Sequence, residues 1–141
     1  ESVIQLLFGR RTGSEGLGLE PVDLVTVETD GSLAQVDSLK VAGAGVAATG
    51  FQVLTNSFDE VLAHPGIAAR QGGLEALGAE CQACPIVTVC GGGLYTHRYR
   101  QGKGFRNPSV YCRDLYRMII HIRDRVAADV EALQRGAVGV R

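Results

Sequence analysis

Apolar side chains recur at helical spacing over the last third of the chain. From Val110 onward they fall three or four positions apart, which places them on one face of a long helix. Asn107 and Pro108 precede this run, and an Asn cap followed by Pro at the first helical position is a typical helix start. The pattern predicts that the longest element begins near Asn107. Its expected apolar stripe consists of Val110, Tyr111, Leu115, Met118, Ile119, Ile122, Val126, Val130 and Leu133.

A different pattern in the first half of the chain predicts a β-hairpin. Residues 22–29 are rich in Val and Thr, residues 32–39 alternate in polarity, and Asp30-Gly31 lies between the two runs. Asp-Gly between alternating segments is a strong hairpin signal. Residues 51–54 fit either a strand or a packed loop.

Short helices are expected on both sides of this hairpin. Residues 1–9 have the pattern of the last turns of a helix that ends near Gly9, followed by a glycine-rich connector. Ser57 and Glu60 have the spacing of a capping box, which predicts a helix over 58–63, and a second helix is expected from Gly66 to about Leu77. Residues 78–107 are expected to be irregular.

These elements indicate an α+β fold: a small β-hairpin and a cysteine-rich loop, flanked by helices with a long C-terminal helix. We expect three parts: the end of a preceding helix and a connector over 1–20, a compact domain over 21–135, and a tail over 136–141. Because the first apolar run has no capping sequence, we also expect that an upstream portion precedes residue 1.

Composition limits the number of domains and the kinds of partner that we expect. A length of 141 residues with 45% hydrophobic side chains fits one domain with a modest core. The 14 basic and 15 acidic side chains give a net charge of -1, which offers no electrostatic case for nucleic acid or an anionic membrane as partner. The sequence has no apolar run of roughly 20 residues and no signal-peptide layout, so we expect a cytoplasmic protein without membrane partners.

The four cysteines carry the candidate chemistry. Cys81, Cys84 and Cys90 are spaced by two and then five residues, and Cys112 follows after 21 more. Disulfides usually join distant parts of small, core-poor secreted domains, and these cysteines are confined to one segment of an ordinary apolar chain. A short pair and a distant ligand on a helix can instead close a four-thiolate metal site. Metal ligation by all four is therefore predicted.

Zinc and a [4Fe-4S] cluster both accept four thiolates, and spacing alone does not separate them. Structural zinc sites more often have two short cysteine pairs, whereas this chain has one. Five basic residues and no carboxylate lie between 97 and 113, which suits an anionic cluster. They are Arg98, Arg100, Lys103, Arg106 and Arg113. Gly91-Gly92-Gly93 would let backbone N–H groups approach sulfur, although such a triplet also serves as a tight turn.

The segment CQACPIVTVCGGGLYTHRYRQGKGFRNPSVYC resembles the cluster region of the SPASM domain, the C-terminal extension of many radical S-adenosylmethionine (radical SAM) peptide maturases. The segments VETDGSLAQVDSLK and SFDEVLAHPGIAARQ are most similar to FxsB-type maturases, which crosslink side chains into cyclophanes. This resemblance implies one auxiliary [4Fe-4S] cluster on Cys81, Cys84, Cys90 and Cys112. It also implies an upstream radical SAM barrel and a ribosomal precursor peptide as partners.

Departures from the family pattern limit this expectation. Cysteines that would hold another auxiliary cluster are missing from the hairpin and from Leu94, so one cluster is expected. The radical-generating CxxxCxxC motif is also absent, so S-adenosylmethionine and its cluster belong to the expected upstream domain. The resemblance therefore implies that this chain is part of an oxidoreductase, and the chain alone is expected to be inactive.

Two other interpretations stay open. The cysteines could form a structural zinc module that folds an interaction surface, and zinc is also the expected contaminant of an aerobic preparation. The hairpin edge could add a strand to a bound peptide with either metal. His97, seven residues after Cys90, is expected to pack rather than to bind the metal.

Overall fold

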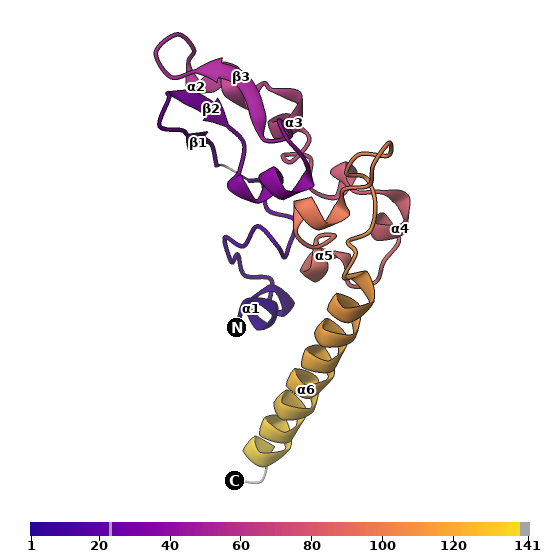
Figure 1. Ribbon diagram of the computed structural model, residues 1–141. Helices are drawn as coiled ribbons and strands as arrows, with labels where there is room; N and C mark the ends of the chain where they lie inside the picture. Colours follow the sequence, from indigo (N-terminus) through magenta and orange to yellow (C-terminus); the bar gives the residue numbers. More distant parts are fainter. Residues whose placement is uncertain (23, 139–141) are drawn as a thin grey trace.

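The computed structural model describes residues 1–22 and 24–138, and it confirms a mixed α+β fold (Figure 1). The strands are β1 (Thr26–Val27), β2 (Ser32–Ala34) and β3 (Ala48–Gln52). The α-helices are α1 (Ser2–Leu7), α2 (Phe58–Leu62), α3 (Pro65–Ala68), α4 (Ala79–Gln82), α5 (Val87–Cys90) and α6 (Cys112–Val138). Short 3-10 helices are η1 (Asp37–Ala42), η2 (Gly73–Ala76) and η3 (Tyr95–Arg98).

The predicted hairpin is present, but its strands are shorter than expected. β1 pairs antiparallel with β2, and the turn between them contains Gly31 at a φ of 82°. The Asp30 carboxylate accepts a hydrogen bond from the Ser32 backbone N–H at 2.9 Å. β2 ends at Ala34 and η1 begins at Asp37. The prediction of one extended run over 32–39 was therefore wrong beyond Ala34. β3 completes a three-stranded sheet in which Leu33 lies opposite Phe51.

The helical region after the sheet confirms one prediction and corrects another. Ser57 and Glu60 form the predicted capping box at the start of α2. The single helix expected from Gly66 to Leu77 is wrong, because the chain forms α3 and then η2. Gly73, the first residue of η2, has a left-handed conformation with a φ of 51°, so the α-helix does not continue into η2.

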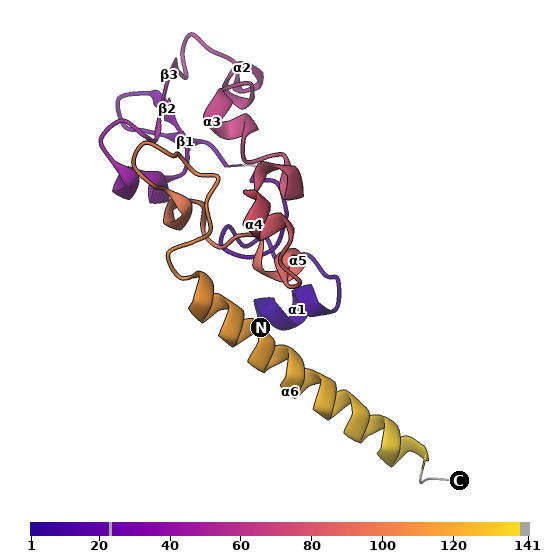
Figure 2. The same ribbon diagram turned by 90° about the vertical axis from the view of Figure 1, so that its right-hand side faces the viewer.

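The longest element is α6, as predicted, but it begins at Cys112 rather than near Asn107. The Asn107 side-chain amide donates to the carbonyls of Arg98 and Gly104, so it holds the preceding loop instead of capping a helix. The N-terminal half of α6 packs against α1 and α5, and its C-terminal half projects clear of the other elements (Figures 1 and 2). Exposed members of the expected apolar stripe lie toward both of its ends: Val110, Tyr111, Met118, Val130 and Leu133.

One core cluster joins α1 and the N-terminal half of α6 to the cysteine segment. Its buried members, which come from α1, α5, α6 and the turn before α5, are Val3, Ile86, Val89 and Ile119. The connector joins them, since the Gly18 backbone N–H donates to the Val89 carbonyl at 2.9 Å. Among the described residues, no helix combines the length and apolar character needed to cross a membrane.

Candidate metal centre

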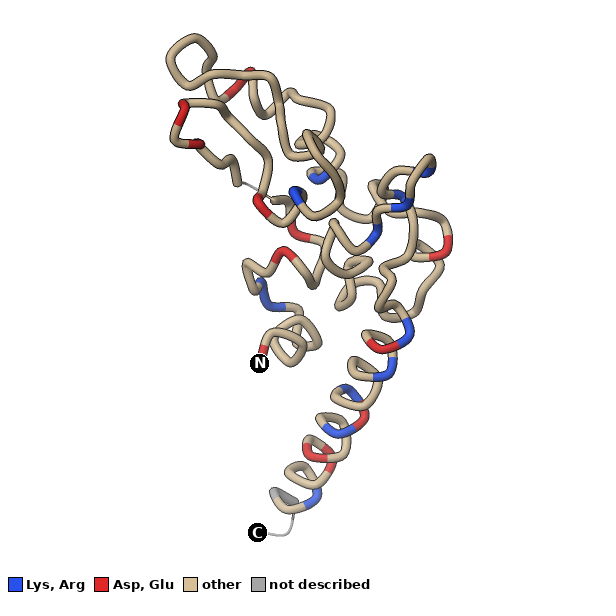
Figure 3. The backbone as a smooth tube through the Cα atoms, viewed as in Figure 1, with Lys and Arg blue, Asp and Glu red and all other residues tan. Residues whose placement is uncertain are grey.

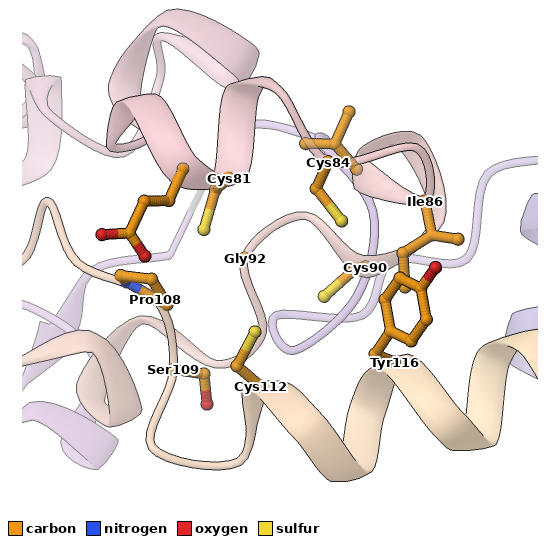
Figure 4. Close-up of a pocket in the computed structure, with 11 residues that line it drawn as sticks. Cys81, Cys84, Ile86, Cys90, Gly92, Pro108, Ser109, Cys112 and Tyr116 are labelled. Carbon is orange, nitrogen blue, oxygen red and sulfur yellow. The ribbon is translucent and has the colours of Figure 1, made fainter.

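The four cysteines surround one cavity. Cys81 lies in α4, Cys84 follows it, Cys90 is the last residue of α5 and Cys112 is the first of α6. All four line a cavity of about 130 Å³. Their sulfur atoms point into this space from three sides (Figure 4). The structure thus brings together every cysteine that the sequence singled out.

Short helical turns orient the first three thiols. The Cys84 backbone N–H donates to the Cys81 carbonyl at 3.1 Å, and the Cys90 N–H donates to the Ile86 carbonyl at 2.8 Å. The expectation of an irregular segment over 78–107 was therefore wrong, because α4, α5 and η3 lie within it. Side chains on such tightly wound turns have few alternative directions, so the thiols are held facing the cavity.

The three glycines after Cys90 bring backbone donors to its sulfur. Gly91, Gly92 and Gly93 have φ values of 60°, 81° and 72°, a conformation that other residues rarely adopt. The backbone N–H groups of Gly92 and Gly93 bond to the Cys90 thiol and lower its pKa, which opposes the larger effect of burial. A Cβ at Gly91 would also overlap the carbonyl oxygen of Gly18. The triplet therefore serves both packing and sulfur hydrogen bonding.

Burial differs among the four ligand candidates. Cys81 is only 9% exposed, whereas Cys112 is exposed. Burial raises the pKa of Cys81, and the neighbouring thiols Cys112 and Cys90 raise it further. Burial likewise raises the pKa of Cys90. A bound cation would reverse this preference at Cys81 and Cys90, because it stabilises the thiolate form.

The described residues hold no preformed site for a single metal ion. Zinc–sulfur bonds are about 2.3 Å long, so the thiolates of a tetrahedral zinc site lie about 3.8 Å apart. Within residues 1–22 and 24–138, no three His, Cys, Asp or Glu side chains are arranged to hold a metal ion. All four cysteines are free of disulfides. All four thiols are therefore available as ligands around the cavity that they line.

The basic residues of the 98–113 segment, which are blue in Figure 3 with the other Lys and Arg, differ in burial. Arg100, Lys103, Arg106 and Arg113 are exposed, and only Arg98 is partly buried. The Arg106 guanidinium donates to the backbone carbonyls of Glu75 and Leu77 at 2.9 and 3.3 Å. The favourable field expected from five charges thus comes at short range from Arg98.

Three further residues clarify the site. His97 packs edge-on against Tyr111 at a ring separation of 4.9 Å and does not line the cavity. Glu80 and Tyr116 line it, and the sequence analysis did not select them. Helical spacing could have identified Tyr116, which is four positions after Cys112 on α6, whereas Glu80 directly precedes Cys81 and has no such signal.

No protein-family model matches the chain, and no curated protein matches its sequence. Two solved structures match its fold: anSMEcpe with bound AdoMet and the Cp18Cys peptide, at a TM-score of 0.60, and anSMEcpe with AdoMet and the Kp18Cys peptide, at 0.59. Each is 17% identical over 92% of this chain. The chain spans about a third (34%) of their length. The chain therefore has a fold found within anSMEcpe, a radical SAM enzyme with a SPASM domain.

Proposed function

We propose that this chain is an auxiliary [4Fe-4S]-binding domain of a radical SAM enzyme that modifies a ribosomally made peptide. The observation that carries the proposal is the convergence of the four cysteine sulfurs on one cavity. The fold shared with anSMEcpe supports the setting, since those structures hold AdoMet and a peptide. Crosslinking of side chains, as in FxsB-type maturases, is the expected reaction of the whole enzyme.

The size of the cavity favours a cluster over zinc. A cavity needs roughly 10–15 Å³ to hold one water, whereas the cavity that the four thiols line with seven other residues measures about 130 Å³. A bare ion would leave most of that volume empty unless the four sulfurs moved inward. A cluster of four irons and four sulfides is larger and meets thiolates at its corners.

The chain's own residues have distinct roles in this proposal. Cys81, Cys84, Cys90 and Cys112 would occupy one coordination position on each iron, which leaves no iron open to substrate. The glycines after Cys90 donate to sulfur, and such hydrogen bonds help to set a cluster's potential. When bound, the cluster supplies one-electron redox chemistry. Electron transfer or structural support is therefore its expected role, rather than direct binding of the peptide.

Anaerobic reconstitution tests the ligand set. The purified chain is incubated with iron and sulfide, and iron, sulfide and zinc are then quantified beside the visible spectrum. We expect four irons and four sulfides per chain, and a large loss of both in each Cys→Ser variant. Tyr116→Phe is a matched control, because this side chain lines the same cavity without a thiol. One zinc per chain without sulfide would instead establish the structural zinc module.

A further inference from the structure

Arg98 is a basic residue whose charge acts on the cysteine thiols, and the described residues offer it no carboxylate partner. Its Nε atom is buried without a hydrogen-bond acceptor. It forms none of the ion pairs found within residues 1–22 and 24–138. Since buried charges in proteins are normally paired, an anion held in the cavity would stabilise this guanidinium.

The side chain of Arg98 packs directly behind the cavity wall. A Cβ built on Gly92 would lie 3.3 Å from the Arg98 Nη1 atom and 3.4 Å from its Cδ atom. Gly92 itself lines the cavity and donates its backbone N–H to the Cys90 sulfur. The Arg98 side chain, together with Leu77, therefore packs against the glycine that lines the cavity beside Cys90.

Aromatic packing fixes this position. The Arg98 Cζ atom lies 4.8 Å from the centre of the Tyr95 ring, and that ring stacks on Phe105 at 4.3 Å. Burial lowers the pKa of Arg98, while Cys81 and Cys90 oppose this shift. A guanidinium keeps its proton in proteins, so the charge persists near both thiols.

We propose that Arg98 is a positioning residue that places a fixed positive charge behind Gly92 and thereby raises the reduction potential of a cluster held by the four cysteines. This inference rests on the proposed function. Uptake of one electron from a one-electron donor makes the cluster more negative by one charge. A nearby cation stabilises that product more than the oxidised form, so it favours reduction.

Arg70 supplies a matched comparison on the same aromatic ring. Its Cζ atom lies 5.1 Å from the Tyr95 centre, and the residue is 8% exposed. Its Nη2 atom lies 3.5 Å from a Glu15 carboxylate oxygen. Burial lowers the pKa of Arg70, and Glu15 and Tyr95 oppose this shift, with no cysteine among the causes, although the Arg70 charge also acts on Arg98. Removing Arg70 therefore removes a buried arginine without removing the charge behind the cavity.

The test is a reductive titration of the reconstituted chain, followed by electron paramagnetic resonance. Arg98→Gln is expected to lower the equilibrium constant for one-electron reduction at least tenfold, which corresponds to 59 mV. Arg98→Lys keeps the charge and should recover most of that loss. Arg70→Gln should leave the potential close to the wild-type value. A structural role alone would change cluster content without this ordering of potentials.

Other results of this titration would contradict either the role of Arg98 or the proposed function. The role of charge would be overturned if the reduction potential fell no further in Arg98→Gln than in Arg70→Gln. It would also be overturned if the potential fell as far in Arg98→Lys as in Arg98→Gln. If Arg98→Gln and Arg98→Met fail to take up a cluster, uptake by Arg98→Lys supports the role of charge and failure of Arg98→Lys overturns it. A wild-type chain that takes up no iron or sulfide contradicts the proposed function itself.

Discussion

At the scale of single residues, Gly91 joins the cysteine segment to the connector. Its left-handed backbone and its closeness to the Gly18 carbonyl both exclude a side chain. Gly91→Ala should therefore lower the free energy of unfolding by more than about 2 kcal/mol. Gly102→Ala is the control, because Gly102 also has a positive φ but no atom near its Cβ position. That variant should cost about 1 kcal/mol. Equal losses in urea unfolding would show that the Gly18 contact is unimportant.

The residues of the site were predictable to different degrees. Cysteine spacing reveals a ligand set, and the four thiols do face one cavity. The partial burial of Arg98, against four exposed neighbours, depends on Tyr95 and Gly92 packing beside it. Those contacts arise from the folded loop, and no local pattern encodes them. Iron binding itself stays a prediction.

At the scale of elements, the capping box fixes the start of α2. The Ser57 hydroxyl accepts from the Glu60 backbone N–H at 3.3 Å, and the Glu60 carboxylate accepts from the Ser57 N–H at 2.7 Å. Ser57→Ala removes one of these bonds and should destabilise the chain by about 1 kcal/mol in chemical unfolding. Ser2→Ala, in α1 without a side-chain cap, should be nearly neutral. A neutral result at Ser57 would contradict the cap.

The Glu60 carboxylate gives this cap a pH dependence. The backbone N–H of Ser57, followed by its hydroxyl, holds the pKa of Glu60 below the usual value. The stability it contributes is complete above its unfolded pKa of about 4.3 and is lost as pH falls through the lower folded value. The stability difference between wild type and Glu60→Ala should therefore shrink below pH 4.3. A difference that grows on acidification would contradict this assignment.

Elements were predicted best where local side chains determine them. The capping box and the Asp30-Gly31 turn act within a few residues, and both form as expected. The start of α6 was misplaced because the Asn107 amide bonds to distant loop carbonyls instead of the helix end. Tertiary contacts thus overrode a good local capping signal.

At the scale of the whole molecule, α6 holds the cysteine region against α1 through Ile119, which is completely buried. Ile119→Ala should lower the free energy of unfolding by about 3 kcal/mol, because it leaves a cavity in this core. Leu133→Ala lies on the projecting half of α6 and is 74% exposed, so it should cost less than about 0.5 kcal/mol. Similar costs in chemical unfolding would contradict this division of the helix. The apolar period identified α6 but did not show which half would be covered.

X-ray absorption of the anaerobically reconstituted chain tests the central claim most directly. A cluster on Cys81, Cys84, Cys90 and Cys112 predicts an iron edge with a sulfur shell and a second shell of neighbouring irons. The signal should be lost in Cys90→Ser and retained in Tyr116→Phe. A zinc edge with one shell of four sulfurs at about 2.3 Å, and no iron neighbours, would contradict the account.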